Sequence, residues 1–166
     1  ISANFGNMFS MAGAALFLPF LPLLAPQILL NNFLSDIPAT AIAGDRVDPE
    51  QIAGPRRWNA RFLRNYMLLF GLVSSVFDFL TFALLLIVFR ASPEEFRTGW
   101  FIESLLTELV IALVVRTRHP FFRSRPSKML LLTTLAVVCI TLLLPYLPFS
   151  RAFGFIPLPA SLMLAM

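Results

Sequence analysis

Long stretches without a charged side chain limit most strongly what this chain can fold into. Residues Ile1–Ser35 contain no Asp, Glu, Lys or Arg, and the same is true of Met129–Ser150 and Ala152–Met166. A membrane-spanning helix needs about 20 consecutive, mostly apolar residues. Long uncharged stretches therefore predict helices in a lipid bilayer. Three prolines between residues 19 and 26 predict a tight turn that divides the first stretch into two helices.

The composition supports this interpretation. The chain is 58% hydrophobic and 13% charged, with a mean hydropathy of +0.80, whereas soluble domains are about 45–50% apolar and about 25% charged. We predict an all-α, polytopic membrane helical bundle of about six transmembrane helices, the last of them truncated. Because the chain begins and ends within apolar sequence, we expect it to be part of a larger membrane protein. The expected segments are 1–18, 26–44, 65–89, 99–117, 129–146 and 154–166.

Positive charges indicate how these helices are oriented. Ten of the 13 Lys and Arg residues gather around two loops, after the second and the fourth expected helix. Short loops rich in Lys and Arg face the cytoplasm, so we expect both loops and the N-terminal end of the first helix on that side. The net charge of +4 fits contact with anionic lipids, and no nucleic-acid-binding module is present. The ten residues are Arg46, Arg56, Arg57, Arg61, Arg64, Arg116, Arg118, Arg123, Arg125 and Lys128.

Thiol and histidine chemistry have little support in this sequence. Cys139 is the single cysteine and lies in an apolar segment, so it has no partner for an internal disulfide. His119 is the single histidine and lies in a basic loop, where a solvated surface residue is the simpler interpretation. The chemistry of this chain is therefore expected to depend on oxygen ligands.

Polar residues inside the first two expected helices form two stripes. Asn4 and Asn7 are three residues apart and share one helical face, and Asn32, Ser35 and Asp36 share another. Such residues are costly in a bilayer and often face an ion path, although Asn and Ser also simply hydrogen-bond to neighbouring helices. Amide, hydroxyl and carboxylate oxygens are the ligands of hard cations. We predict that these five residues form a metal site.

The residues around this second stripe refine the prediction. Pro38 removes a backbone donor and is expected to break the helix, which frees carbonyl groups to line a cavity. Asn31 points about 100° away from Asn32 and is therefore the less favoured ligand.

Three further carboxylic acids fall within expected membrane segments. Glu103 lies near the outer end of its helix, where it can reach the headgroups, and Glu108 lies five residues deeper. Asp78 is in the middle of a helix, beside Ser74 and Ser75. Each of the two deeper acids is expected to be protonated or paired between helices, and Glu108 and Asp78 are secondary candidates for the metal site.

The sequence resembles the C-terminal transmembrane region of P-type cation-transporting ATPases, from the fifth to the tenth helix, and most closely the bacterial magnesium-transporting class. "SANFGN" is similar to the Ser-Asn-x-Gly motif of the fifth helix, and "LLNNFLSDIPATAIAGD" to the sixth-helix motif. "DRVDPEQI" and the later "PRRW" are similar to the loop that follows, and "GWFIESLLTELVIALVVRTR" to the eighth helix. The resemblance covers nearly the whole of residues 1–166.

This resemblance implies a function. Asn4, Asn7, Asn32, Ser35 and Asp36 match ion-ligand positions of the fifth and sixth helices, and Glu108 matches an acidic or amide position of the eighth. Calcium pumps have a glutamate where this chain has Asn7, and two residues rather than one between the positions of Asp36 and Pro38. One carboxylate among neutral oxygens suits a partly hydrated Mg²⁺ better than Ca²⁺, which often takes several carboxylates.

The resemblance also shows what this chain does not contain. The phosphorylation motif Asp-Lys-Thr-Gly, the actuator motif Thr-Gly-Glu, the nucleotide-binding sequence and the fourth helix are not found. The expected role is the membrane part of an ATP-driven Mg²⁺ importer of the bacterial inner membrane. ATP would bind to cytoplasmic domains outside this chain, and the chain alone has no catalytic residue and should be inactive. Alternatives are a six-helix support domain without its own ion site, or the same pump class carrying Ca²⁺, H⁺ or Ni²⁺.

Overall fold

The computed structural model describes residues 2–42, 44–45, 60–115 and 126–165. Within these ranges the chain forms six α-helices and no strand. The fold is the all-α membrane bundle that the sequence predicts. The helices are α1 (Ser2–Ala14), α2 (Ala25–Ile42), α4 (Ala60–Ala83, extended by the π-helical turn Leu84–Val88), α5 (Pro93–Val115), α6 (Lys128–Leu143) and α7 (Ala160–Ala165).

Helix ends follow local sequence signals. The chain between α1 and α2 is non-helical where Pro19 and Pro22 occur. At the start of α5, the Ser92 hydroxyl accepts from the Glu95 amide at 3.3 Å and the Glu95 carboxylate accepts from the Ser92 amide at 2.7 Å. This capping box satisfies two amides that the first turn leaves free. Ser127 caps α6 in the same way, through a bond of 3.2 Å from the Leu130 amide.

The last expected helix, 154–166, is helical only in its second half, from Ala160 to Ala165. A 3₁₀-helix spans Ser150–Phe153 after the shorter one at Leu144–Tyr146, and α-helix resumes only at Ala160. Gly154 has a φ of 76°, which ends the 3₁₀-helix in the left-handed region. Two prolines between residues 155 and 159 then keep the chain extended. Helical periodicity alone does not show this interruption.

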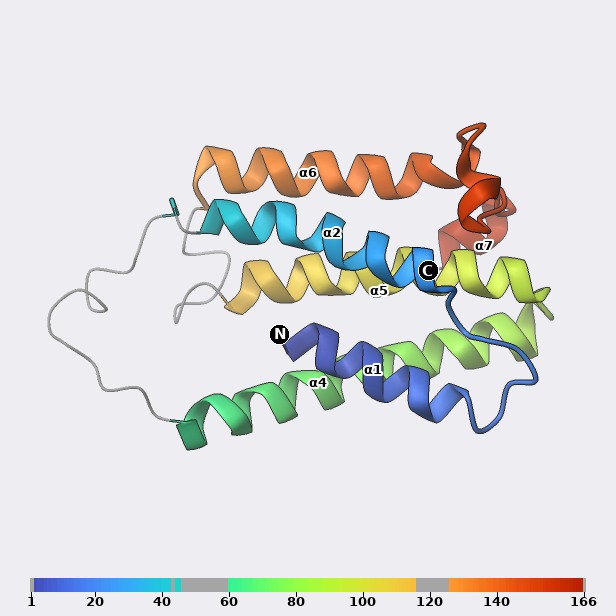
Figure 1. The fold of residues 1–166 in the computed structure, drawn as a ribbon, viewed down its shortest axis with the longest axis horizontal. Coiled ribbons are helices and arrows are strands. Elements are labelled where there is room, and N and C mark those ends of the chain that lie inside the picture. The colour runs from blue at the N-terminus through green and yellow to red at the C-terminus, as the bar shows by residue number, and fades with distance from the viewer. Residues whose placement is uncertain (1, 43, 46–59, 116–125, 166) are drawn as a thin grey trace, which may run out of the picture.

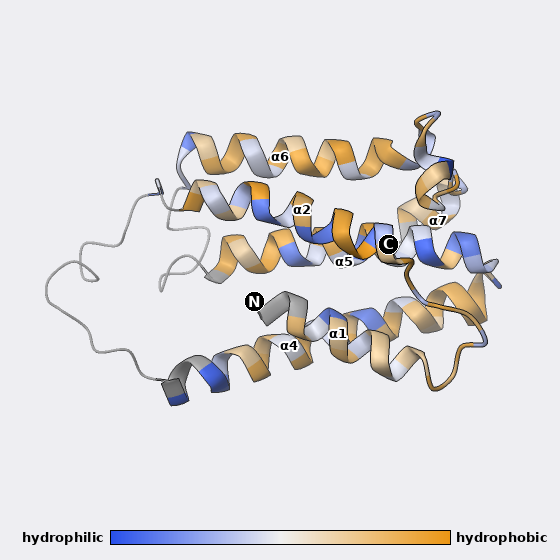
Figure 2. Ribbon diagram, in the orientation of Figure 1, coloured by the Kyte–Doolittle hydropathy of each residue, from blue (hydrophilic) through white to orange (hydrophobic). Residues whose placement is uncertain are grey.

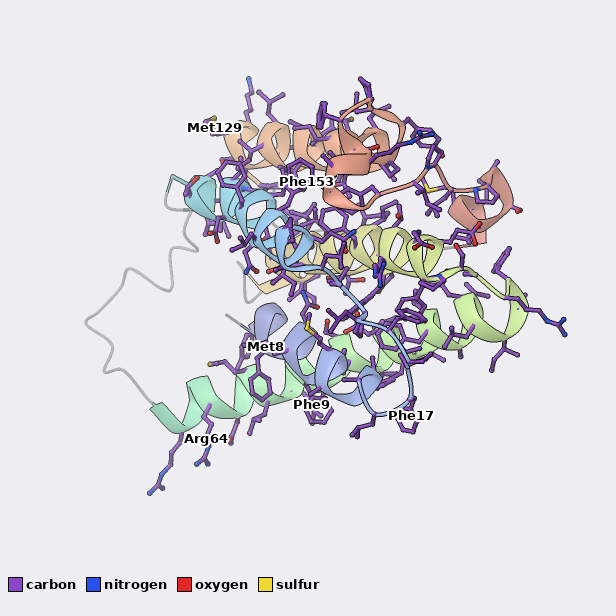
Figure 3. The ribbon with its side chains drawn as sticks, turned by 45° about the vertical axis from the view of Figure 1, so that its right-hand side comes forward. Met8, Phe9, Phe17, Arg64, Met129 and Phe153 are labelled. Atoms are coloured by element: carbon purple, nitrogen blue, oxygen red, sulfur yellow. The ribbon has the colours of Figure 1, made fainter. Side chains whose placement is uncertain are left out.

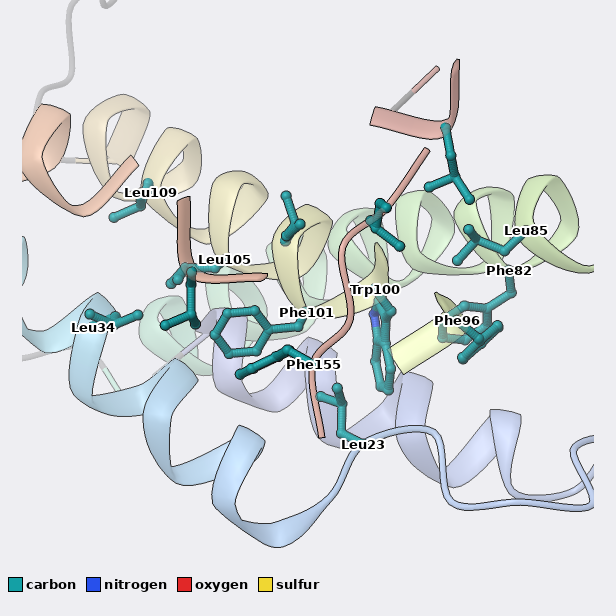
Figure 4. Close-up of a cluster of buried hydrophobic side chains, with 14 of the residues drawn as sticks. Leu23, Leu34, Phe82, Leu85, Phe96, Trp100, Phe101, Leu105, Leu109 and Phe155 are labelled. Atoms are coloured by element: carbon teal, nitrogen blue, oxygen red, sulfur yellow. The ribbon is translucent and has the colours of Figure 1, made fainter. Parts of the chain in front are cut away.

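Helix α5 is the centre of the bundle. It packs against α2 and α6 on one side and against α4 and α1 on the other, while α1 lies along α4 and α2 along α6 (Figure 1). The core gathers around the first half of α5, where Trp100, Phe101 and Leu105 are fully buried, and Phe155 packs on Phe101 with ring centroids 4.6 Å apart (Figure 4). The segment after α6 therefore closes the end of the bundle at which α5 begins.

The outer surface of the bundle is apolar. Hydrophobic residues continue round the outward faces of the helices (Figure 2), and Met8, Phe9 and Phe17 of the N-terminal segment project away from the core (Figure 3). Two described helices, Arg64–Val88 and Lys128–Tyr146, are long and apolar enough to cross a membrane by length and composition. In lipid, such faces need no protein partner, because acyl chains are as apolar as the side chains.

Small residues bring α1 and α4 into close contact. A Cβ added at Gly6 would lie 2.9 Å from the Gly71 carbonyl oxygen and 3.0 Å from Cβ of Ser74. The Ser75 hydroxyl is within hydrogen-bonding distance of both helix backbones. It lies 3.2 Å from the Gly6 carbonyl oxygen of α1 and 2.9 Å from the Gly71 carbonyl oxygen of α4. Small residues at helix interfaces allow this close approach in membranes, so the glycine of "SANFGN" has a packing role.

Candidate ion-binding site

Helix α2 presents its polar residues without a break. We expected Pro38 to interrupt the helix, but α2 continues through it to Ile42. The proline still lacks an N–H group, so the Leu34 carbonyl has no helical donor four residues later. Next to the proline, the Thr40 hydroxyl donates to the Ile37 carbonyl at 2.7 Å, so the side chain satisfies one backbone acceptor of this turn.

The buried face of α2 carries Asn31, which its spacing from Asn32 had made the less favoured metal ligand. Buried positions recur at Gln27, Asn31, Leu34, Pro38 and Ala41, the spacing of one helical face. Asn31 is 3% exposed, whereas Asn32 is only partly buried. The sequence does contain a sign that Asn31 belongs to this face. Gln27, Asn31 and Ser35 are spaced four residues apart, which aligns them along one side of a helix.

Asn31 contacts an acid of α5. Its Nδ2 donates to Oε2 of Glu108 at 3.2 Å, which joins residues 77 positions apart in the chain. The other amide atom, Oδ1 of Asn31, is buried, and none of the described residues donates a hydrogen bond to it. A buried acceptor without a partner costs free energy and calls for an explanation. The contact therefore leaves one unsatisfied oxygen beside one carboxylate.

Two more oxygen-bearing side chains of α2 reach the same acid. The Ser35 hydroxyl donates to the Asn32 carbonyl oxygen at 3.1 Å and lies near the Glu108 carboxyl. Asp36 is close enough to Glu108 for the two carboxylates to repel each other. The Asp36 side chain is exposed and makes no hydrogen bond or ion pair with the rest of the described chain. We call Asn31, Ser35, Asp36 and Glu108 the α2–α5 cluster.

The remaining expected ligands are Asn4 and Asn7 of α1 and Asn32 of α2. Asn7 is partly buried on α1, which packs on α4 and reaches α5 but does not pack along α2. Asn4 belongs to α1, and its side chain lies outside the described part of the structure. The Asn32 side chain has no hydrogen-bond partner within the described residues. The structure thus places Ser35 and Asp36 near Glu108, whereas Asn7 lies on a helix that packs mainly on α4.

Asp78 and Glu103 are placed together, away from the α2–α5 cluster. Both are buried where α1, α4 and α5 meet. The Asp78 carboxylate accepts from the Trp100 indole at 2.7 Å and from the Ser10 hydroxyl at 2.5 Å. Glu103 was expected to reach the headgroups, but it is 8% exposed and faces the protein interior. Asp78 therefore lies outside the proposed cation site.

The chemistry available in the α2–α5 cluster is that of oxygen ligands. It combines two carboxylates with an amide oxygen and a hydroxyl. Within the described residues, no three His, Cys, Asp or Glu side chains come together. The cluster therefore suits a hard cation that takes few carboxylates and keeps part of its water, and it does not suit a soft transition metal.

An apolar helical bundle that holds amide and carboxyl side chains between two of its helices is typical of membrane transport proteins. Residues 20–166 match the family described as "Cation transporting ATPase, C-terminus". The chain belongs to this family, as the resemblance of its helices predicted.

Curated relatives agree with this assignment. Over 165 residues the chain is 43% identical to "Magnesium-transporting ATPase, P-type 1" of Salmonella typhimurium (strain LT2) and 42% identical to the protein of the same name from Escherichia coli (strain K12). Each comparison covers 96% of this chain and 18% of the relative. The chain thus spans about a fifth of the length of the relatives that it matches.

Proposed function

We propose that this chain is the C-terminal membrane region of an ATP-driven Mg²⁺ transporter and that its α2–α5 cluster forms part of the transported ion's path. The observation that supports this most directly is the contact of Asn31 with Glu108, which leaves the buried Oδ1 of Asn31 without a donor among the described residues. A cation beside Glu108 would satisfy that oxygen and relieve the repulsion between Glu108 and Asp36.

The ligand set favours Mg²⁺. This ion binds through one or two carboxylates and retains several waters, whereas Ca²⁺ takes six to eight oxygen ligands, often with several carboxylates. Asp36 and Glu108 supply two carboxylates, and the exposure of Asp36 leaves room for ordered water. Asn4, Asn7 and Asn32 remain proposed ligands from the resemblance, since α1 also reaches α5, the helix that carries Glu108.

The wider function follows from the family. We infer that ATP is bound and hydrolysed by domains outside this chain, so that the chain alone is inactive. The net movement is import of Mg²⁺ across the bacterial inner membrane. The first basic loop begins after α2, and the second ends where α6 starts. These two points are close together, since the Ser127 amide donates to the Asp45 carboxylate at 2.6 Å. We propose that this basic end, with the N-terminal end of α1, faces the cytoplasm and its anionic lipids.

Ion uptake by the full-length protein that contains this chain tests the proposal. Purified protein in liposomes is supplied with ATP, and Mg²⁺ movement is compared for the wild type, Asp36→Asn and the control Glu94→Gln. Glu94 is a half-exposed carboxylate in the first turn of α5, 3.9 Å from Arg97 and outside the α2–α5 cluster. We expect Asp36→Asn to abolish most Mg²⁺ uptake and the control to retain it.

Other outcomes separate the alternatives. Undiminished uptake by Asp36→Asn would leave a support domain without an ion site as the better description. ATP hydrolysis that Ca²⁺, H⁺ or Ni²⁺ stimulates more strongly than Mg²⁺ does would keep the pump and change its cargo.

A further inference from the structure

A second polar cluster lies where α1, α4 and α5 meet, and the proposed transport does not use it. Asp78 of α4 is 1% exposed and Glu103 of α5 is 8% exposed. The two carboxyl groups lie close enough to interact. Two ionised carboxylates in contact cannot hydrogen-bond, because each offers only acceptors.

The donors around this pair are distributed unequally. Both oxygens of Asp78 already accept a hydrogen bond: Oδ2 accepts from Ser10 at 2.5 Å and Oδ1 from the Trp100 indole at 2.7 Å. On Glu103, Oε1 accepts from the Thr107 hydroxyl at 2.8 Å, whereas Oε2 is buried and receives no hydrogen bond from any described residue. Asp78 therefore has the surroundings of a carboxylate, and Glu103 has one oxygen that needs a proton.

No positive charge in the described part of the chain balances the pair. Among the described residues, no Lys or Arg forms an ion pair with either acid. Arg97 of α5 pairs instead with Glu94, near the start of the helix. Along α5 the next acid is Glu108, five residues away in the α2–α5 cluster. A double negative charge buried in a membrane bundle without a cation would carry a large desolvation cost.

We propose that Asp78 and Glu103 form a proton-binding site in which a single proton sits on Oε2 of Glu103 and is donated to Asp78. The bound proton leaves the pair with one negative charge, which the Ser10 hydroxyl and the Trp100 indole stabilise through their bonds to Asp78. It also joins α4 to α5, while Ser10 connects the same carboxylate to α1. The site is separate from the proposed Mg²⁺ path and does not depend on it.

This placement of the proton predicts an asymmetry between two amide substitutions. In Glu103→Gln the amide Nε2 takes the place of the protonated oxygen, while Oε1 still accepts from Thr107. In Asp78→Asn one carboxylate oxygen becomes an NH₂ group, which faces the donor hydrogen of Ser10 or Trp100. We expect the full-length protein to keep its melting temperature in Glu103→Gln, and Asp78→Asn and Glu103→Leu to lower it by several degrees.

Infrared difference spectroscopy of the full-length protein at neutral pH locates the proton directly. The wild type minus Glu103→Gln should show the C=O stretch of one protonated carboxylic acid, and the wild type minus the control Glu94→Gln should not. A spectrum without that band would mean that both acids are ionised, and a melting temperature that falls more in Glu103→Gln than in Asp78→Asn would place the proton on Asp78. Either result overturns the proposal, and neither one bears on Mg²⁺ transport.

Discussion

Replacing Gly6 with alanine tests whether the close approach of α1 and α4 positions the first membrane helix. The added methyl group would lie 2.9 Å from the Gly71 carbonyl oxygen and 3.0 Å from Cβ of Ser74. Because one of these atoms belongs to a helix backbone, the two helices must separate, which lengthens the contact of Ser75 with the Gly6 carbonyl, now 3.2 Å.

The magnitude follows from these contacts. Overpacking a well-packed interface costs about 1–3 kcal/mol, and an interhelical hydrogen bond in a membrane is worth about 0.6 kcal/mol. Alanine recovers about 1 kcal/mol of helix propensity relative to glycine. We expect a net loss of about 1–2 kcal/mol in the free energy of unfolding.

Gly13→Ala provides a matched control on the same helix. Its new methyl group would lie 2.6 Å from Cζ of Phe79, the end of a partly exposed side chain that can rotate away. Reversible unfolding of the purified membrane protein in mixed detergent micelles measures both variants. The reasoning is refuted if Gly6→Ala is as stable as the wild type, or if Gly13→Ala loses as much stability as Gly6→Ala.

Three further substitutions test other buried contacts. Gln27→Met removes the acceptor of the Leu24 amide (2.9 Å) and the donor to the Gly154 carbonyl (3.3 Å), and should cost about 1–3 kcal/mol in unfolding free energy. Gly154→Ala forces a left-handed φ of 76° on a residue with a Cβ and should cost about 1–2 kcal/mol or more, since that Cβ also meets Leu24 at 2.6 Å. Trp100→Phe removes the indole that donates to Asp78 at 2.7 Å and should cost about 1–3 kcal/mol in unfolding free energy. An unchanged unfolding midpoint in the same assay would show that this bond is unimportant.

Much of the fold could be predicted from the sequence, because a charge-free apolar run has few alternatives to a membrane helix. The predicted turn after the first helix occurs where prolines interrupt the chain, and a π-helical turn completes the long helix around Asp78. The interruption by Pro38 was predicted and does not occur, since a helix with its neighbouring bonds intact tolerates one missing donor.

The site was harder to predict than the fold. Spacing showed that Ser35 and Asp36 share a face, but it did not show which helix packs against that face. The packing of α2 on α5 turns Asn31 inward to Glu108, and the glycine-mediated packing of α1 on α4 holds Asn7 on a helix that does not lie along α2. Pairings between residues 77 positions apart depend on helix packing, and one sequence carries little direct signal of that packing.

The most direct test of the proposed ion path measures how ATP hydrolysis by the full-length protein depends on free Mg²⁺, with the nucleotide kept saturated. The variant Glu108→Gln keeps a side chain of the same shape beside Asn31 and removes only the charge, and Glu94→Gln is the control. We predict that Glu108→Gln raises the half-saturating concentration of the transported Mg²⁺ by about tenfold or more, which corresponds to about 1.4 kcal/mol of lost binding free energy, while Glu94→Gln leaves it unchanged. An unchanged Mg²⁺ dependence in Glu108→Gln would contradict the proposal that the α2–α5 cluster binds the transported ion.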